Sequence, residues 1–595
     1  MSAFTPAQQS AIAARGNVLV VAGAGTGKTR TLIARCLQLV REGASLDEML
    51  LVTFTEAAAA EMRVRLRKAM QAELEKASAS DAERLAEQLA LLDTAQISTL
   101  HSFCLRLVRE HFHHLAIDPQ LVILDERQTR PLARDCLTAL LAEHYAGRHP
   151  HSDAVQQLIR RAGRGSDEHL RVLVLKLHRY AQSLPDPDAW FADQLAAFRE
   201  PAPTQWEAWL ATALAEWRDE WLPALASAPD VPALTLARGA LRAVTNTRAG
   251  DLQSPSAASA ADGAATASRR HEIQLSTALT EILAADADWP RGTKTKLRPP
   301  FAKFFDEAAF FHGLLTPASP PQTQDAIPHP PSPLAEDWNW CRHEMAALVQ
   351  LTQQFTTRFG EAKRQLGGVD FADLEQFALR LLRDDTTGVA RSCRARFTQV
   401  CVDEYQDINA AQDAILRLVS GEGADANRFL VGDLKQSIYL FRLANPHIFA
   451  AYAKAWRGPG SSRREEAPTE CGMRNAECGM RNAECGMGSG SLLTSAATGV
   501  IALSENFRSR EAVLNFVNPL FRALMRESIG GVDYDAEAEL KFGNPEGRTL
   551  LRNPVPATSS RRPDTTNATE RQQEVAGLFP LLNLLYGTPI ECLVG

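Results

Sequence analysis

The sequence predicts an α/β protein in which a doubly wound parallel sheet carries a phosphate-binding loop and is interrupted by a large, mostly helical insertion. Three observations predict this fold. Six short runs rich in Val, Ile and Leu are spread along the chain, each followed by a helical or loop segment. A glycine-rich loop comes directly after the first run. Between residues 105 and 396 the strand pattern gives way to amphipathic segments rich in Ala, Leu, Arg and Glu.

The composition is that of a large globular protein. The chain has 595 residues, 45% of them hydrophobic and 23% charged, and this length predicts roughly three to four domains. The net charge of −7 argues against a protein that coats nucleic acid on all its faces, although a local basic channel is compatible with it. No stretch approaches a membrane span, the N-terminus lacks a secretory leader, and the ten cysteines show no CxxC pair. We therefore expect a cytoplasmic protein with no membrane contact, disulfide framework or zinc site.

The six apolar runs define the predicted sheet. In chain order they are NVLVV (17–21), MLLVTF (49–54), AQIST (95–99), TQVCVDE (398–404), RFLVGD (428–433) and GVIAL (499–503). Because the helical region separates the third run from the fourth, the sheet is expected to come from two distant parts of the chain.

Three segments have the composition of linkers, at 254–268, 316–333 and 458–495. The last contains ECGMRNAECGMRNAECGM, which we interpret as the translation of a tandem DNA repeat. A heptad coiled coil is the alternative, but the unit offers little apolar surface for a seam.

The glycine-rich loop AGAGTGKT follows a predicted strand and opens a predicted helix. In that context backbone N–H groups and a helix N-terminus hold phosphate oxygens. Lys28 would reach the β- and γ-phosphates and Thr29 would bind Mg²⁺, while Ala22 stands where the general pattern has its first glycine. The competing interpretation is a chance glycine-rich turn. The candidate nucleotide-binding residues here are Ala22, Gly23, Ala24, Gly25, Thr26, Gly27, Lys28, Thr29 and Arg30.

A pair of carboxylates ends the fourth apolar run, in VCVDEYQD. Nucleotide hydrolysis needs a second metal ligand and a group that polarises the attacking water. Asp403 would hold Mg²⁺ through water and Glu404 would orient the nucleophile. Acidic pairs are also common on solvated surfaces, so the position at a strand end in a chain with a phosphate loop is what favours the functional interpretation.

These motifs, with five others in the same order, resemble the superfamily 1 DNA helicases of the UvrD/RecB type. The other motifs are FTPAQQ, VTFTEAAAAEM (52–62), ISTLHSFCLRLVR (97–109), VGDLKQSIYLFRLANP (431–446) and LSENFRSR (503–510). TEAAAAEM, HSFCLRLVREHF, VDFADLEQFALRLL and GDLKQSIYLFR are similar to the helicase-nuclease proteins AddA and RecB, and to AddA above all. The resemblance covers residues 4 to about 127 and 367–540.

The resemblance implies a role for further residues at the nucleotide. Gln8 would read adenine, Gln436 would sense the γ-phosphate, and Arg508 would stabilise transition-state charge from a second motor domain. It also implies an ordered set of contacts with single-stranded DNA, in which Phe54, Tyr439 and Phe441 stack on bases and Thr53, Thr55, His101 and Arg442 lie near the backbone. For any one of these aromatic residues alone, core packing is the competing interpretation.

The resemblance further implies a division into RecA-like domains. We expect a first RecA-like ATP-binding domain from residues 1–110 and 367–457, with residues 111–366 as a helical insertion that contains linkers. Residues 458–498 form a low-complexity repeat, and 499–595 the start of a second RecA-like domain. Motifs V and VI and the nuclease domain of the family are not found, so we expect the chain to be truncated. Asp535, Glu539 and Lys541 imitate a D…ExK nuclease pattern, but we interpret them as part of the region after LSENFRSR.

The function implied by the resemblance is that of an ATP-dependent 3'-to-5' DNA helicase in recombinational repair. It would use ATP and Mg²⁺, act on single-stranded DNA and duplex ends, and have an AddB-like partner. The first alternative is a noncatalytic fragment that binds ATP and DNA and needs a partner for hydrolysis. The second is a P-loop enzyme with a small-molecule substrate.

Overall fold

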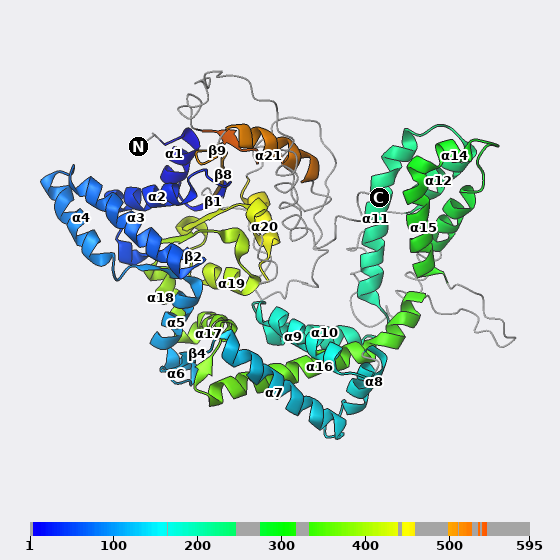
Figure 1. Cartoon of the computed structure of the whole chain (residues 1–595), viewed down its shortest axis with the longest axis horizontal. Coiled ribbons are helices and arrows are strands. Elements are labelled where there is room, and N and C mark those ends of the chain that lie inside the picture. The colour runs from blue at the N-terminus through cyan, green and yellow to red at the C-terminus, as the bar shows by residue number, and fades with distance from the viewer. Residues whose placement is uncertain are drawn as a thin grey trace, which may run out of the picture.

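The fold comprises an α/β core and a long helical arm (Figure 1). The computed structural model describes residues 4–162, 165–244, 274–316, 333–437, 443–457, 498–509, 511–525, 534–535 and 538–543. The seven-residue repeat and almost all of the three predicted linkers lie outside these residues.

The core is built on a six-stranded sheet with the order β3-β2-β6-β7-β1-β8. Its strands are β1 (Asn17–Ala22), β2 (Met49–Thr53), β3 (Gln96–Thr99), β6 (Gln399–Val402), β7 (Arg428–Gly432) and β8 (Thr498–Leu503). Every neighbouring pair is parallel. All six predicted runs are therefore strands of one sheet, and their carboxyl ends meet at one edge, where parallel α/β sheets bind ligands.

Helices cover both faces of the sheet. One face carries α2 (Lys28–Glu42), α3 (Glu56–Leu74) and α4 (Ala79–Leu91), and the other carries α5 (Leu100–Glu110), α17 (Phe371–Arg383), α18 (Val389–Arg396), α19 (Ala410–Leu418) and α20 (Pro446–Trp456). α1 (Pro6–Ala13) packs beside α2. Along β1, Leu19 enters one hydrophobic core and Val18 and Val20 enter the other. Burial on both faces explains why the strands are continuous apolar runs.

The last strand of the sheet corrects one predicted boundary. We predicted that a second RecA-like domain begins at residue 499, but β8 pairs in register with the whole of β1, from Asn17↔Thr498 to Ala22↔Leu503. Without β8, the apolar strand β1 would be an open sheet edge with unpaired backbone groups. β9 (Glu505–Asn506), α21 (Glu511–Leu524) and β10 (Lys541–Phe542) follow outside this sheet. The second domain stays a prediction for the residues beyond β8.

The insertion forms the helical arm. After α6 (Phe112–Leu115) and β4 (Val122–Ile123), its helices are α7 (Glu126–Tyr145), α8 (Ser152–Ala162), α9 (Glu168–Gln182), α10 (Pro187–Arg199), α11 (Thr204–Ala226), α12 (Pro232–Ala243), α14 (Lys294–Leu297), α15 (Ala302–Leu315) and α16 (Pro333–Gln365). Residues 274–285 are also helical. The chain returns to the core through β5 (Gly368–Val369), which pairs with β4.

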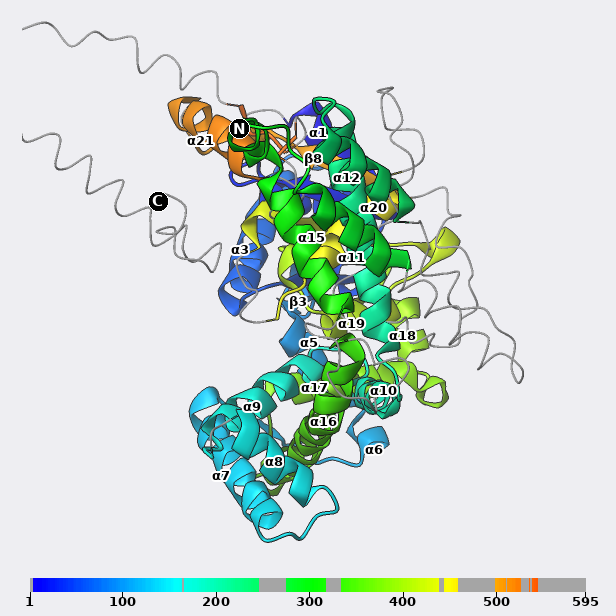
Figure 2. The same ribbon diagram turned by 90° about the vertical axis from the view of Figure 1, so that its right-hand side faces the viewer.

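The arm contains two separate helical packs. α7, α8 and α9 pack on one part of α16, and α11, α12 and α15 share a second core in which the rings of Trp217 and Phe304 stack at 5.1 Å. Figure 2 shows the two packs at different heights. The 33 residues of α16 give it a length of about 50 Å, so it joins the core to the far pack. Among the described residues, no helix is both long and apolar enough to cross a membrane.

A buried lysine fixes the junction between arm and core. Lys363, near the end of α16, is 2% exposed. Its Nζ lies 2.6 Å from Asp370 Oδ2 and 2.7 Å from Asp373 Oδ2, at the N-terminus of α17, and 4.4 Å from the centre of the Phe359 ring. The Asp370 side chain also accepts the backbone N–H of Asp373 as the N-cap of α17. The ion pairs therefore orient the end of α16 relative to the first turn of α17.

Replacing Lys363 is expected to loosen this junction. Lys363→Ala leaves Asp370 and Asp373, which are partly buried, without the cation that pairs with them. Loss of one partner from a buried ion pair costs about 3–5 kcal/mol, which is the upper limit expected here. Chemical denaturation followed by circular dichroism would measure the fall in the free energy of unfolding. Lys68→Ala, at an exposed lysine of α3, is the control and should change it by less than about 0.5 kcal/mol. Equal unfolding curves for the two variants would contradict this role of Lys363.

Candidate functional site

The phosphate loop joins β1 to α2 at the carboxyl edge of the sheet. Gly25 and Gly27 have φ values of +74° and +85°, in the left-handed region that glycine adopts without strain. The Thr26 hydroxyl donates to the Gly23 carbonyl at 2.8 Å and closes the turn. Lys28 and Thr29 then open α2, so the first N–H groups of a 15-residue helix face the loop.

Lys28 connects two other predicted catalytic residues, Glu404 and Gln436. Its Nζ donates to Glu404 Oε2 at 2.7 Å and to Gln436 Oε1 at 3.4 Å. The Gln436 Nε2 donates in turn to Asp433 Oδ2 at 2.7 Å. The ends of β1, β6 and β7 thus supply one hydrogen-bonded cluster, with the ion pair between Lys28 and Glu404 at its centre.

Glu404 is held in an unusual backbone conformation. Its φ of +54° is in the left-handed region, which a residue with a side chain adopts at a cost and which occurs often at functional sites. Gln406, 1% exposed, supports it, because its Nε2 donates to Glu404 Oε2 at 2.9 Å and its Oε1 accepts the Asp433 backbone N–H at 2.9 Å. Gln406 therefore ties Glu404 to the end of β7.

Two neighbouring carboxyl groups have raised pKa values. Burial raises the pKa of Asp403 to about 6, with the Glu404 charge adding to the shift and the Lys28 charge opposing it. Burial and the Glu404 charge also raise the pKa of Asp407 to about 6. The Oδ1 atom of Asp407 is buried with no hydrogen-bond partner among the described residues. A concentration of negative charge at this edge would be relieved by a cation.

The NFRS segment lies against the phosphate loop. Asn506, 1% exposed, donates from Nδ2 to the Ala24 carbonyl at 2.7 Å, and its Oδ1 accepts the N–H groups of Arg508 and Ser509. The Phe507 N–H donates to the Gly25 carbonyl at 2.9 Å. A Cβ atom at Gly25 would lie 2.8 Å from Arg508 Cβ, so glycine is needed for this close approach. Arg508 is therefore brought beside the loop, and its contact with the γ-phosphate stays a prediction.

Gln8 and Arg30 lie on the other side of the loop. Gln8, in the first turn of α1, donates from Nε2 to the Thr26 carbonyl at 3.0 Å, and its Oε1 accepts the Thr5 N–H at 3.1 Å. The Arg30 guanidinium lies 4.4 Å from the centre of the Phe4 ring. In this structure the Gln8 amide supports the loop, and its reading of adenine stays a prediction.

The segment after α21 also packs against the phosphate loop. A Cβ atom at Gly23 would lie 2.5 Å from Leu540 Cδ2, so the Leu540 side chain packs directly against the loop. Of the nuclease-like residues on this segment, Glu539 accepts a hydrogen bond from Arg522 at 2.6 Å. No cluster of His, Cys, Asp and Glu suited to a metal occurs among the described residues.

The predicted DNA contacts occupy the ends of β2 and β3. Thr53 is buried and its hydroxyl donates to the Thr55 carbonyl at 3.1 Å, whereas the Thr55 side chain caps α3 and is exposed. Phe54 is half-buried between them. His101, in the first turn of α5, lies 2.9 Å from Glu375 Oε1 on α17. Tyr439, Phe441 and Arg442 lie outside the described residues.

The structure adds an aromatic residue that sequence reasoning missed. Phe371, the first residue of α17, is 50% exposed, and its ring centre lies 4.6 Å from that of His101. Gln406, Asp433 and Asn506 were also missed, although each lies within a quoted motif. Their role in holding catalytic groups depends on contacts between strand ends, which a motif pattern does not reveal.

The residues present fit a nucleoside triphosphate and Mg²⁺. The glycine-rich loop leads into the N-terminus of α2, where helix N–H groups can bind phosphate oxygens, and the Lys28 ammonium lies at the same sheet edge. Thr29 and Asp403 would offer the oxygen ligands that Mg²⁺ prefers. These features could bind, orient and hydrolyse a phosphoanhydride.

A parallel α/β sheet with this loop and a carboxylate pair at the end of β6 defines a P-loop protein of the helicase class. Residues 4–221 and 318–456 match the family described as the UvrD/REP helicase N-terminal domain. The match covers more than half of the chain, and the chain therefore belongs to the UvrD/REP helicase family.

Relatives within this family are AddA proteins, each named as one subunit of an ATP-dependent helicase/nuclease. The one from Heliobacterium modesticaldum is 34% identical over 575 residues, which cover 91% of this chain and 38% of the relative. Those from Moorella thermoacetica and Geobacillus thermodenitrificans are 33% and 34% identical, covering 93% and 92% of this chain and 37% and 42% of the relatives. The chain thus spans about two fifths of the length of the curated relatives it matches.

Removing the Asn506 side chain is expected to impair turnover more than folding. Asn506→Ala frees Arg508 and leaves the Ala24 carbonyl without its partner, so ATP hydrolysis should fall about 10- to 100-fold, or about 1.4–2.7 kcal/mol. Steady-state hydrolysis with a parallel titration of a fluorescent nucleotide would separate turnover from binding.

Asn427→Ala is the matched control for this prediction. Asn427 is similarly buried and bonds the Gly421 N–H and the Phe397 carbonyl, but it precedes β7 at the opposite edge of the sheet. It should destabilise the fold without lowering turnover per folded molecule. Equal losses of turnover in both variants would show that Asn506 acts through stability alone.

Proposed function

We propose that the chain is the motor part of an AddA-like DNA helicase, which hydrolyses ATP to move 3' to 5' along single-stranded DNA in recombinational repair. The observation that carries the proposal is the convergence of Lys28, Glu404 and Gln436 at the sheet edge that also carries Phe54 and His101. The family membership and the names of the relatives support the same function.

Hydrolysis would begin by separating the pair of Lys28 and Glu404. Phosphate oxygens in the cradle would compete for the Lys28 ammonium, which moves from Glu404 to the β- and γ-phosphates. Glu404 is then free to accept a hydrogen bond from the attacking water and orient it in line. Thr29 and Asp403 would hold Mg²⁺, which when bound neutralises charge on the phosphate oxygens. Gln436 and Arg508 would contact the γ-phosphate from β7 and from the NFRS segment.

The same edge would hold the DNA strand. Phe54 and Phe371 offer rings to bases, with Tyr439 and Phe441 as further stacking candidates, and His101 contacts Phe371 directly. Thr53, Thr55 and Arg442 are proposed backbone contacts. Because Gln436 precedes Tyr439 by three positions, a change at the γ-phosphate would be passed to the base contacts through one short segment.

The proposed partners follow from the relatives. Their names describe one part of a helicase/nuclease that has more than one chain, so we propose an AddB-like partner and duplex DNA ends as the substrate of the assembly. In this assembly the present chain would supply the ATP cradle and the first part of the DNA track.

ATP hydrolysis by the chain alone, with and without a single-stranded oligonucleotide, is the direct test. We expect DNA to stimulate hydrolysis, and Glu404→Gln to lower it by at least about 100-fold with nucleotide binding retained, because general-base contributions are of that size. Binding of ATP without turnover by the wild-type chain would favour the alternative of a fragment that needs a partner. Turnover that ignores DNA and survives Glu404→Gln would refute the proposal.

A further inference from the structure

A groove lined with arginines lies between α7 and α9 of the helical arm. It has a volume of about 650 Å³. Its lining consists of Glu126, Arg127, Arg130, Pro131, Arg134, Leu137, Glu168, Arg171, Val172 and Leu175. Pro131, Leu137, Val172 and Leu175 give it an apolar surface between the charged side chains. The α/β site described above uses none of these residues.

Three of the arginines carry charge that is not neutralised locally. Arg127, Arg130 and Arg134 are exposed, and no carboxylate of the described residues lies within 4.0 Å of their guanidinium groups. Arg171 differs, because Asp167 pairs with it at 2.9 Å. The two glutamates, Glu126 and Glu168, each lie in the first turn of a helix, where the helix dipole offsets negative charge. The groove therefore presents a row of three available cations.

The spacing of the row suits a nucleic-acid backbone. Positions 127, 130 and 134 follow one another by three and four residues, so they lie on the same face of α7. At about 1.5 Å per residue they extend over about 10 Å, which equals about three of the roughly 3.4 Å axial steps between phosphates on one strand of B-form DNA. Guanidinium groups also bind phosphate oxygens in a bidentate manner.

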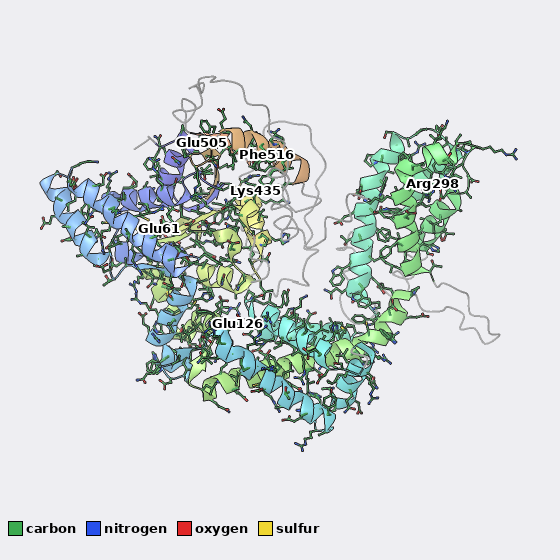
Figure 3. The ribbon with its side chains drawn as sticks, in the orientation of Figure 1. Glu61, Glu126, Arg298, Lys435, Glu505 and Phe516 are labelled. Carbon is green, nitrogen blue, oxygen red and sulfur yellow. The ribbon has the colours of Figure 1, made fainter. Side chains whose placement is uncertain are left out.

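The groove begins beside the proposed DNA track. β4 and β5 pair, and the Leu124 N–H donates to the Val369 carbonyl at 2.8 Å. Glu126 and Phe371 each lie two residues beyond this bonded pair and begin α7 and α17. Figure 3 labels Glu126 where α7 leaves the core. A strand that contacts Phe371 and His101 can thus continue onto the first turns of α7.

We propose that the groove between α7 and α9 is a DNA-backbone site in which Arg127, Arg130 and Arg134 bind phosphates along one strand and extend the track from the core onto the arm. The inference rests on the proposed function, because it assumes that the core binds DNA. Sequence-independent contacts of this kind add affinity through release of counterions and therefore weaken as salt rises. The apolar side chains that line the groove would contact sugars and bases beside the phosphates.

The test is the salt dependence of DNA binding by the full chain. A variant that combines Arg127→Gln, Arg130→Gln and Arg134→Gln is titrated against fluorescent single-stranded and duplex oligonucleotides at several salt concentrations. We expect at least about a tenfold loss of affinity at about 0.1 M salt and a log–log salt slope shallower by about 2, at about 0.7 per single-strand phosphate. A larger loss with single strands or with duplex identifies which form occupies the groove.

Two matched variants make the result specific. Arg148→Gln, Arg291→Gln and Arg364→Gln combined remove the same charge from exposed positions elsewhere on the arm and should leave the slope unchanged. Arg127→Lys, Arg130→Lys and Arg134→Lys combined keep the charge and should retain most of the slope. If the glutamine variant had lost affinity through misfolding, restoring charge alone would not explain such a recovery. Circular dichroism checks that all variants fold.

Three outcomes would overturn the inference. They are an unchanged slope in the glutamine variant, an equal change in the control variant, and unchanged DNA binding with loss of binding to polyglutamate, which would assign the groove to an acidic protein. A wild-type chain that binds no DNA would instead refute the proposed function, so the two failures are distinguishable.

Discussion

The ion pair between Lys28 and Glu404 joins two residues that are 376 positions apart and defines the chemistry of this molecule. It forms because β1 and β6 are parallel strands of one sheet with β7 between them, so that the groups following each strand meet at the carboxyl edge. Opposite charges 2.7 Å apart at a partly shielded site attract each other more strongly than they would in open water. The same ion pair holds Lys28 at the phosphate loop and Glu404 beside it. Phosphate binding would exchange one partner of the lysine for another.

The rest of the site consists of side chains that hold backbone and catalytic groups together. Gln406 spans from Glu404 to the end of β7, and Asn506 spans from the phosphate loop to Arg508. Both amides are almost fully buried, so each polar atom left without a partner would be costly. The Glu404 backbone, strained at a φ of +54°, depends on these constraints. Precise placement of the catalytic groups is thus a property of the residues packed behind them.

The helical arm is continuous with the site through a small junction. β4 and β5 pair where the chain leaves and re-enters the core, and the buried Lys363 fixes α16 against α17. As a result, Phe371 at the start of α17 and the arginine row at the start of α7 are both placed by the same junction. The arm has hydrophobic cores of its own, separate from those on the two faces of the sheet. The junction with the core determines where the arm places its surfaces beside the proposed DNA track.

The six strands, the phosphate loop, the carboxylate pair and the interruption by helices could all be predicted from the sequence. These features follow from local chemistry, because buried parallel strands need continuous apolar runs and a phosphate cradle needs glycines before a helix. Three features could not be predicted in this way and are seen in the folded chain: β8 completes the first sheet, Gln406 and Asn506 hold the catalytic groups, and Phe371 lies beside His101. Each of these depends on contacts between residues far apart in the chain, and a run such as GVIAL carries no information about which strand it will join. The physical reason is that strand pairing satisfies backbone groups irrespective of side chain, so the partner is chosen by the packing of the whole core.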